Sequence, residues 1–227
     1  MKQFEKPIIF NTEMVRAILE ARKTQTRRVI RVKGFEWIHE AKFVHVENPK
    51  EGVSEVWWDV IRGVPTCVDQ YYDYMKCPYG KPGDLLYVRE TWSPKRHNFP
   101  TGFPYEYKAT AEKDGNPIDE PWKPSIHMPK EAARIWIRVK GVRVERVQDI
   151  SESDAVMEGC RDSDLVTYKA DPVPVISAEL TQAAGTVKES FRHLCDSINQ
   201  KRGFGWEENP WVWVVEFETV NTKGRPQ

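Results

Sequence analysis

Apolar residues recur at helical spacing in two parts of the chain. In the first part, Asn11 and Thr12 are candidate N-caps of a helix that ends near Arg22. The apolar face of this helix comprises Met14, Val15, Ile18 and Leu19. In the second part, Thr186 and Glu189 form a capping box at the start of a helix. Its buried stripe comprises Phe191, Leu194, Cys195 and Ile198. Between these two, Ser151 resembles a cap of a short helix that Gly159 ends.

Period-two alternation predicts strands elsewhere. An apolar strand is expected at residues 7 to 10, and another at residues 85 to 88. A third begins at Arg134, where Ile135, Ile137 and Val139 alternate with Trp136, Arg138 and Lys140. The last strand, residues 211 to 218, places Trp211, Trp213, Val215 and Phe217 on one face. Short strands with a few helices between them predict an α+β fold built on a small curled sheet or barrel.

Two long segments do not fit these periodic patterns. Residues 35 to 76 are aromatic and mixed in character, and we expect short strands and loops there. Seven prolines fall between Pro94 and Pro129, so residues 93 to 129 are neither continuous helix nor central strand. A segment of that kind is more often a binding loop than a spacer. Because there is no internal repeat or linker, we predict one domain, residues 1 to 227, with insertions at about 35–76 and 93–129.

Composition excludes several classes of protein. The 34 basic residues cancel the 34 acidic ones, which excludes a uniformly basic nucleic-acid coat but permits a local basic site. The longest apolar runs fall far short of a membrane span, and the N-terminus lacks a secretory signal, so we expect no membrane association and a cytoplasmic location. The four cysteines form no C-x-x-C pair. A zinc set of Cys67, Cys77, His39 and His45 matches no common ligand spacing, so we predict neither a metal nor another cofactor.

The charge is strongly uneven along the chain. Residues 16 to 33 carry seven positive side chains and one negative, Glu20, which leaves +6 on eighteen residues. A solvated, salt-bridged face would explain such a run. However, the cluster surrounds the hydroxyls of Thr24 and Thr26, at a point where a helix passes into a loop. A functional site is the alternative interpretation.

The residues of this turn resemble the signature of the ASCH domains, which are PUA-like β-barrels related to RNA-binding and modified-base-reading modules. The resemblance begins at residues 18 to 28, Ile-Leu-Glu-Ala-Arg-Lys-Thr-Gln-Thr-Arg-Arg, and continues in order through residues 83–88, 137–150, 151–159 and 212–217. It covers about half of the chain, and the whole is similar to the larger ASCH proteins of phages and prophages. It implies an α+β, PUA-like small β-barrel with flanking helices and the two insertions. One departure is Ala21, which stands where the family usually has a glycine and so puts a left-handed backbone there in question.

The resemblance also implies a chemistry. Small bacterial ASCH proteins include an amidohydrolase that removes the acetyl group of N4-acetylcytidine with a Lys, a Thr and a Glu. By motif, these residues fall on Lys23, Thr26 and Glu158, with Glu152 as a competitor for the last. Thr26 would be the nucleophile or position a water, Lys23 would be the base or the oxyanion donor, and Glu158 would move the proton.

Further side chains are candidates for contact with a nucleoside or nucleic acid, and RNA is favoured over DNA. They are Arg22, Arg27, Arg28, Glu90, Trp92, Ser125 and His127. Trp92 could stack on a base or belong to the core, and His127 could be an ordinary loop histidine. A non-catalytic module that binds RNA or modified nucleic acid, or a ribonuclease, is the alternative to an acyl-removing hydrolase. The chain has no phosphate-binding glycine loop, no G-x-S-x-G and no H-E-x-x-H, so other hydrolase classes lack support.

Overall fold

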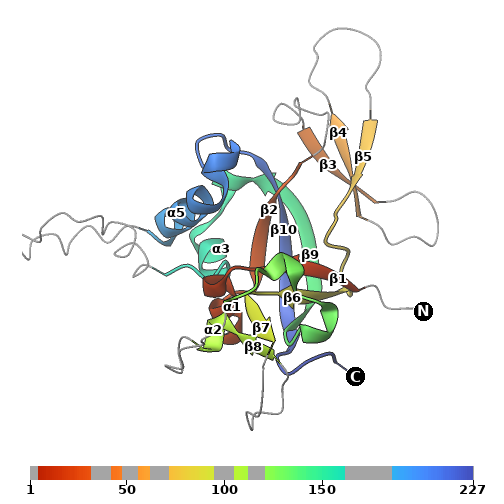
Figure 1. The fold of residues 1–227 in the computed structure, drawn as a ribbon. Coiled ribbons are helices and arrows are strands. Elements are labelled where there is room, and N and C mark those ends of the chain that lie inside the picture. Colours follow the sequence, from red (N-terminus) through yellow and green to blue (C-terminus); the bar gives the residue numbers. More distant parts are fainter. Residues whose placement is uncertain are drawn as a thin grey trace, which may run out of the picture. The chain divides into compact units, whose positions relative to one another are not determined.

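The computed structural model describes residues 5–31, 42–47, 56–61, 72–94, 105–111, 121–161 and 186–226 (Figure 1). Its α-helices are α1 (Thr12–Leu19), α2 (Lys108–Ala111), α3 (Glu152–Met157) and α5 (Val187–Asn199). The strands are β1 (Glu5–Ile9), β2 (Gln25–Val29), β3 (Lys42–Glu47), β4 (Val56–Ile61), β5 (Tyr72–Lys76), β6 (Leu85–Arg89), β7 (Trp92–Pro94), β8 (Tyr105–Tyr107), β9 (Trp136–Arg146) and β10 (Trp211–Asn221). Single 3-10 turns occupy Ser125–His127, Lys130–Ala132, Val147–Asp149 and Gln200–Arg202. No described helix is long and apolar enough to cross a membrane.

The strands form three sheets, and the α+β prediction is confirmed. The largest sheet has the order β1-β6-β9-β10-β2, with β1 parallel to β6 and β6 antiparallel to β9. Strands β3, β4 and β5 form an antiparallel sheet inside the first predicted insertion, and β7 pairs with β8 inside the second. Within the described residues no pairing joins β1 to β2, so the expected barrel is not closed by hydrogen bonds.

The chain divides into two compact units, and each is discontinuous in sequence. The first unit comprises Met1–Thr24, Pro78–Gly141 and Glu216–Gln227, and the second comprises Gln25–Cys77 and Val142–Val215. Strands β9 and β10 contribute residues to both units. The prediction of a single domain stays a prediction.

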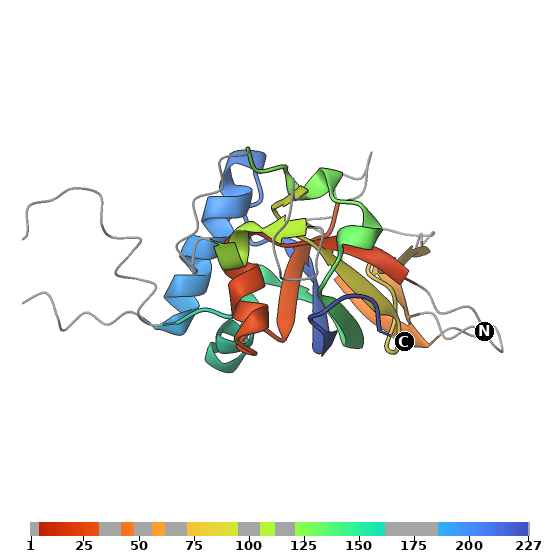
Figure 2. The same cartoon turned by 60° about the horizontal axis from the view of Figure 1, so that its bottom comes forward.

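In the first unit, strands β6 and β9 and the residue that precedes β9 contribute to the core. Leu86, Val88, Ile135 and Ile137 are fully buried. Trp136, which the alternation placed opposite Ile135 and Ile137, is also buried, and its indole N–H donates to the Ala133 carbonyl at 3.2 Å. Helices α1 and α2 lie side by side in both views (Figures 1 and 2), and Arg16 donates to the Ala109 carbonyl at 3.0 Å.

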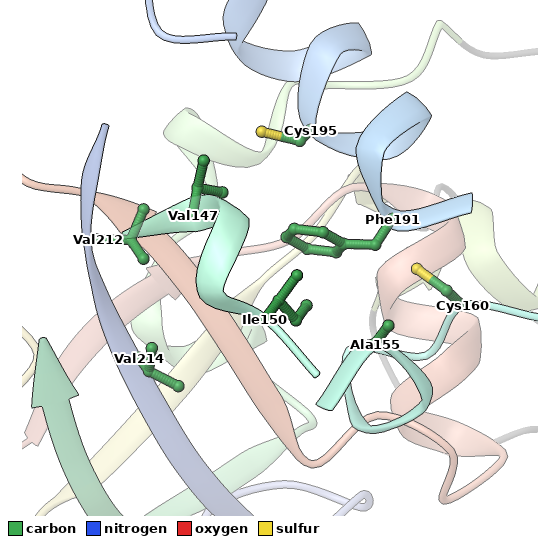
Figure 3. Packing of buried hydrophobic residues seen from close by; sticks show 8 residues of the cluster. All are labelled: Val147, Ile150, Ala155, Cys160, Phe191, Cys195, Val212 and Val214. Atoms are coloured by element: carbon green, nitrogen blue, oxygen red, sulfur yellow. The ribbon is translucent and has the colours of Figure 1, made fainter. Parts of the chain in front are cut away.

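The second unit has its apolar core beneath α5. The Thr186 hydroxyl accepts from the Glu189 amide, as the predicted capping box requires, and Phe191 and Cys195 are buried. Figure 3 shows the Phe191 ring reaching from α5 toward Val147 and Ile150. Ala155 of α3 and Val212 and Val214 of β10 complete this cluster with Cys160. The helical stripe read from the sequence is therefore the face that α5 buries.

Helix α1 ends in a Schellman motif. The Arg22 amide donates to the Ala17 carbonyl at 2.9 Å, and the Ala21 amide donates to the Ile18 carbonyl at 3.0 Å. Ala21 has φ 56°, so the left-handed conformation that the alanine put in question is present. The geometry of the cap requires it, although the methyl group of alanine disfavours it.

Replacing this alanine with glycine should stabilise the protein. A left-handed alanine costs roughly 1–2 kcal/mol, and the greater flexibility of glycine in the unfolded chain offsets part of the gain. We expect Ala21→Gly to raise the unfolding free energy by about 1 kcal/mol and the melting temperature by roughly 2–4 °C. Thermal unfolding of both proteins measures this, with Ala111→Gly in α2 as the control that should lose stability. An unchanged or lower melting temperature for Ala21→Gly would contradict the account.

Candidate active site

Lys23 is a buried lysine that the end of α1 carries inward. Its amide donates to the same Ala17 carbonyl that closes the Schellman motif, at 3.1 Å. The residue is 1% exposed, and its Nζ lies 5.8 Å from the centre of the Phe10 ring. Lysine is almost never fully buried without a partner or a function. The cap of α1 thus places the side chain of Lys23 in the interior of the first unit.

Thr26 lies in β2, which begins two residues after Lys23. It is 1% exposed. Side chains alternate along a strand, so Gln25, Arg27 and Val29 share one face and Thr26 and Arg28 share the other. Val29 packs against the cluster around Phe191, and the Arg27 guanidinium lies 5.7 Å from the centre of the Phe191 ring. Thr26 therefore lies on the face of β2 opposite the Phe191 cluster.

Glu158 follows α3 and is placed by a second Schellman motif. The Cys160 amide donates to the Ala155 carbonyl at 3.2 Å, and the Gly159 amide donates to the Val156 carbonyl at 2.8 Å. Gly159 has φ 92°, as its predicted role as a helix stop requires. Glu158, the residue before it, is 3% exposed. The competing Glu152 is exposed and accepts from the Lys188 amide, so Glu158 is the buried carboxylate of this segment.

Arg27 connects Glu158 to two more carboxylates. Its guanidinium pairs with Glu145 at 2.6 Å, with Asp154 at 3.1 Å and with Glu158 at 3.1 Å. The Arg27 side chain is 2% exposed, as is that of Glu158. Arg143 pairs with Glu145 and Asp154 from its own position on β9. Two guanidinium groups thus face three carboxylates, and the set carries one net negative charge.

Gln25 completes this network through its amide. Its Nε2 donates to Asp154 at 3.0 Å, and its Oε1 accepts from Arg27 at 3.2 Å. Burial raises the pKa of Asp154, but the hydrogen bond from Gln25 and the charges of Arg143 and Arg27 outweigh this effect and hold that pKa below its usual value.

The first unit contains a separate buried ion pair. Arg134 donates to both oxygens of Glu90, at 2.9 Å each, and its guanidinium lies 4.0 Å from the centre of the Tyr107 ring. Glu90 is 1% exposed. Burial raises the pKa of Glu90 above its ordinary value, and Arg134 opposes this rise.

The other predicted contact residues have different surroundings. Trp92 is buried in a cluster with Tyr107 and Met128, while the ammonium of Lys123 lies 5.4 Å from the centre of its ring. His127 is exposed and Ser125 is half-buried, both in one 3-10 turn. Arg89 attaches this turn by donating to the carbonyls of Ile126 and Met128. The predicted site residues are divided between the two units. The first unit contains Arg22, Lys23, Glu90, Trp92, Ser125 and His127, and the second contains Thr26, Arg27, Arg28 and Glu158.

Three of the seven basic side chains of the run at residues 16 to 33 form ion pairs. Arg16 pairs with Glu13, Arg22 pairs with Glu20, and Arg27 binds its three carboxylates. The salt-bridged interpretation of the run thus describes these three arginines.

Sequence reasoning missed several residues of both clusters. They are Gln25, Arg143, Glu145 and Asp154 in the second unit and Tyr107 and Arg134 in the first. Two signals were present in the sequence. Asp154 of α3 and Glu158, the C-cap of α3, are four residues apart, and Arg143 and Glu145 are two residues apart on β9. Both spacings place the two side chains on one face.

The described residues contain no group of three His, Cys, Asp or Glu side chains that could hold a metal ion. Cys67 and His39 of the zinc set considered above lie outside the described residues.

No protein-family model and no curated protein matches this sequence. Among solved structures, the chain is similar to an ASCH domain from Lactobacillus crispatus JV V101, with 14% identity and a TM-score of 0.37 over 96% of this chain and 80% of that chain. It is also similar to a protein of Enterococcus faecalis V583 described as DUF984, with 11% identity and a TM-score of 0.39 over 100% of this chain and 86% of that chain. Both TM-scores lie below 0.5.

Removing Arg134 should destabilise the protein strongly, because Glu90 would keep a buried charge without a counter-ion. We expect Arg134→Met to lower the unfolding free energy by about 3–5 kcal/mol, measured by urea unfolding at pH 7. The double variant Glu90→Gln/Arg134→Met leaves no unpaired charge and should lose less. A single variant within about 0.5 kcal/mol of the parent protein would show that the pair is not a buried ionic contact.

Because of Asp154, the free energy of unfolding should decrease as the pH falls below about 4. Its pKa is lower in the folded protein than in the unfolded chain, so its stabilising contribution is fully present above the unfolded value of about 4 and is lost as the pH falls through the folded pKa. Asp154→Asn should therefore cost stability at pH 7 and progressively less toward pH 3. Urea unfolding across this range tests the expectation. Glu207→Gln, at an exposed ion pair with Arg192, is the control with little effect at any pH. A penalty for Asp154→Asn that does not shrink on the acid side would contradict the account.

Proposed function

We propose that this protein is a hydrolase that removes an acyl group from a modified pyrimidine nucleoside or nucleic acid, by amide hydrolysis of the N4-acetylcytidine type. The observation that carries the proposal is the burial of all three side chains that the sequence motif singles out. Lys23, Thr26 and Glu158 are 1%, 1% and 3% exposed. Among the described residues, the buried polar or charged set is small: Lys23, Gln25, Thr26, Glu90, Ser93, Glu158 and Ser190.

This burial is costly for a lysine and a glutamate. Moving an ammonium or a carboxylate out of water costs several kcal/mol unless other groups compensate. The chain near Lys23 and near Glu158 also has exposed positions, since Ala21 and Met157 are exposed. A charged side chain could therefore have stayed in water in either segment. A chain that buries these two charges and a hydroxyl at the positions of a hydrolytic motif supports a chemical role for them.

The reaction assigns each side chain a task. Attack on the acyl carbon forms a C–O bond and an oxyanion, and the C–N4 bond then breaks to give the free amine of cytidine and acetate. The motif would make Lys23 the base or the oxyanion donor, and it would make Glu158 the group that carries a proton to N4. Thr26 would attack with its own hydroxyl, giving an acyl-enzyme that water cleaves, or would hold the attacking water.

The disposition of the arginines favours hydrolysis over a non-catalytic RNA-binding role or a ribonuclease. Affinity for RNA comes largely from cationic side chains that face phosphates. Arg27 is buried among carboxylates, and Arg16 and Arg22 pair with neighbouring glutamates. These three side chains are therefore not arranged as a phosphate-binding surface.

Turnover of N4-acetylcytidine and of N4-acetylated RNA, followed by chromatography of the products, tests the proposal. Lys23→Met keeps the buried stem but removes the charge, and we expect it to lower kcat by at least 100-fold, as for loss of a group acting in the transition state. Glu158→Gln should act similarly. Lys201→Met, at an exposed position, is the matched control and should keep full activity.

Two results would overturn this proposal. One is a parent protein that releases no cytidine from either substrate, and the other is a folded Lys23→Met variant with unchanged kcat. RNA binding that weakens steeply with salt, without product, would instead favour the non-catalytic alternative. Trapping of an acetylated Thr26 peptide, detected by mass, would assign the attacking group.

A further inference from the structure

We infer that Arg27 is a positioning residue that fixes the orientation of the Glu158 carboxylate. This inference rests on the proposed function, because it assigns Arg27 a task in the same reaction. The sequence had suggested contact with nucleic acid for Arg27. Its burial and its three carboxylate partners assign it to the interior instead.

The orientation of the Arg27 guanidinium is fixed from several sides. Its Nε and Nη2 both donate to Glu145, at 2.8 and 2.6 Å, and Nη2 also donates to Asp154 at 3.1 Å. A guanidinium is planar, so these bonds determine where the remaining nitrogen points. That nitrogen, Nη1, donates to Glu158 Oε1 at 3.1 Å.

The anchoring carboxylates are themselves held in place. Arg143 donates to the second oxygen of Glu145 at 3.1 Å and to Asp154 at 2.9 Å. Gln25 donates to the other oxygen of Asp154. Glu158 is the C-cap of the six-residue helix α3. The anchored guanidinium of Arg27 therefore meets its carboxylate from a fixed direction.

Stability alone gives a poor account of an arginine at this position. Arg27 shares its face of β2 with Val29, which packs against the Phe191 cluster, and its own guanidinium lies over the Phe191 ring. An apolar residue would suit that face, and replacement of buried ion pairs by apolar residues is often neutral or stabilising. Only a side chain with a hydrogen-bond donor can bind and orient the Glu158 carboxylate from this position, and an apolar residue could not.

The inference predicts a specific kinetic change. Arg27→Met keeps Glu158 but removes the bond from Arg27 that directs its carboxylate, so we expect kcat on N4-acetylcytidine to fall about 100-fold while KM stays within about threefold. Added guanidinium ion should restore part of the lost rate, which repair of a merely structural defect would not do. Arg146→Met is the matched control, because Arg146 is a packed arginine of the same unit that stacks on Trp211 and donates to Asn209. It should keep kcat within about threefold of the parent protein.

A double-mutant cycle provides a readout that does not depend on turnover. Urea midpoints are measured for Arg27→Met, Glu158→Gln and the double variant, and non-additive shifts would support a direct coupling of the two side chains. Additive shifts would overturn the inference even if the protein is a hydrolase. Coupled side chains with an unchanged kcat in Arg27→Met would also overturn it. A parent protein without activity removes the proposed function and the positioning role together, and the cycle would then describe an ion pair alone.

Discussion

The second unit depends on one constraint: a guanidinium that is removed from water must find enough negative charge to replace its hydration. Arg27 satisfies this with carboxylates from β9, from within α3 and from the residue that ends α3. The three contacts join segments that are more than a hundred residues from Arg27 in sequence. Because a buried charge without a partner is so unfavourable, the conformations of these segments are coupled to that of β2.

Helix ends, rather than helix faces, present the candidate catalytic groups. Lys23 follows a left-handed Ala21 and Glu158 precedes a left-handed Gly159, and both helices close with the same pair of hydrogen bonds. The Schellman motif reverses the chain within two residues, so a side chain beside it can turn inward. In α3 a glycine adopts this conformation easily, whereas in α1 an alanine is held in it against its preference. The cap of α1 is therefore maintained by its surroundings, which include the buried Lys23.

Local patterns were sufficient for the regular elements and for part of the site. The caps Thr186 and Ser151, the stripe of α5 and the stop at Gly159 all follow from short-range rules, and the structure has them where the sequence indicated. Trp136 departs from the alternation: its ring packs against Tyr87 and its indole N–H donates to the Ala133 carbonyl, and no spacing rule contains either contact. Likewise, the sequence around Glu145 does not indicate a buried ion pair, because its partner Arg27 lies 118 positions away.

The basic run of residues 16 to 33 shows why charge in a sequence does not translate directly into a binding surface. These eighteen residues carry a net charge of +6. The charge at their surface in the folded protein also depends on residues from other parts of the chain. Folding brings Glu145, Asp154 and Glu158 to Arg27, and these carboxylates come from a region that the window excludes. The same arginine that would bind a phosphate if exposed instead holds a carboxylate once buried, because the guanidinium geometry suits both anions equally. Burial, which depends on the tertiary fold, decides between the two uses.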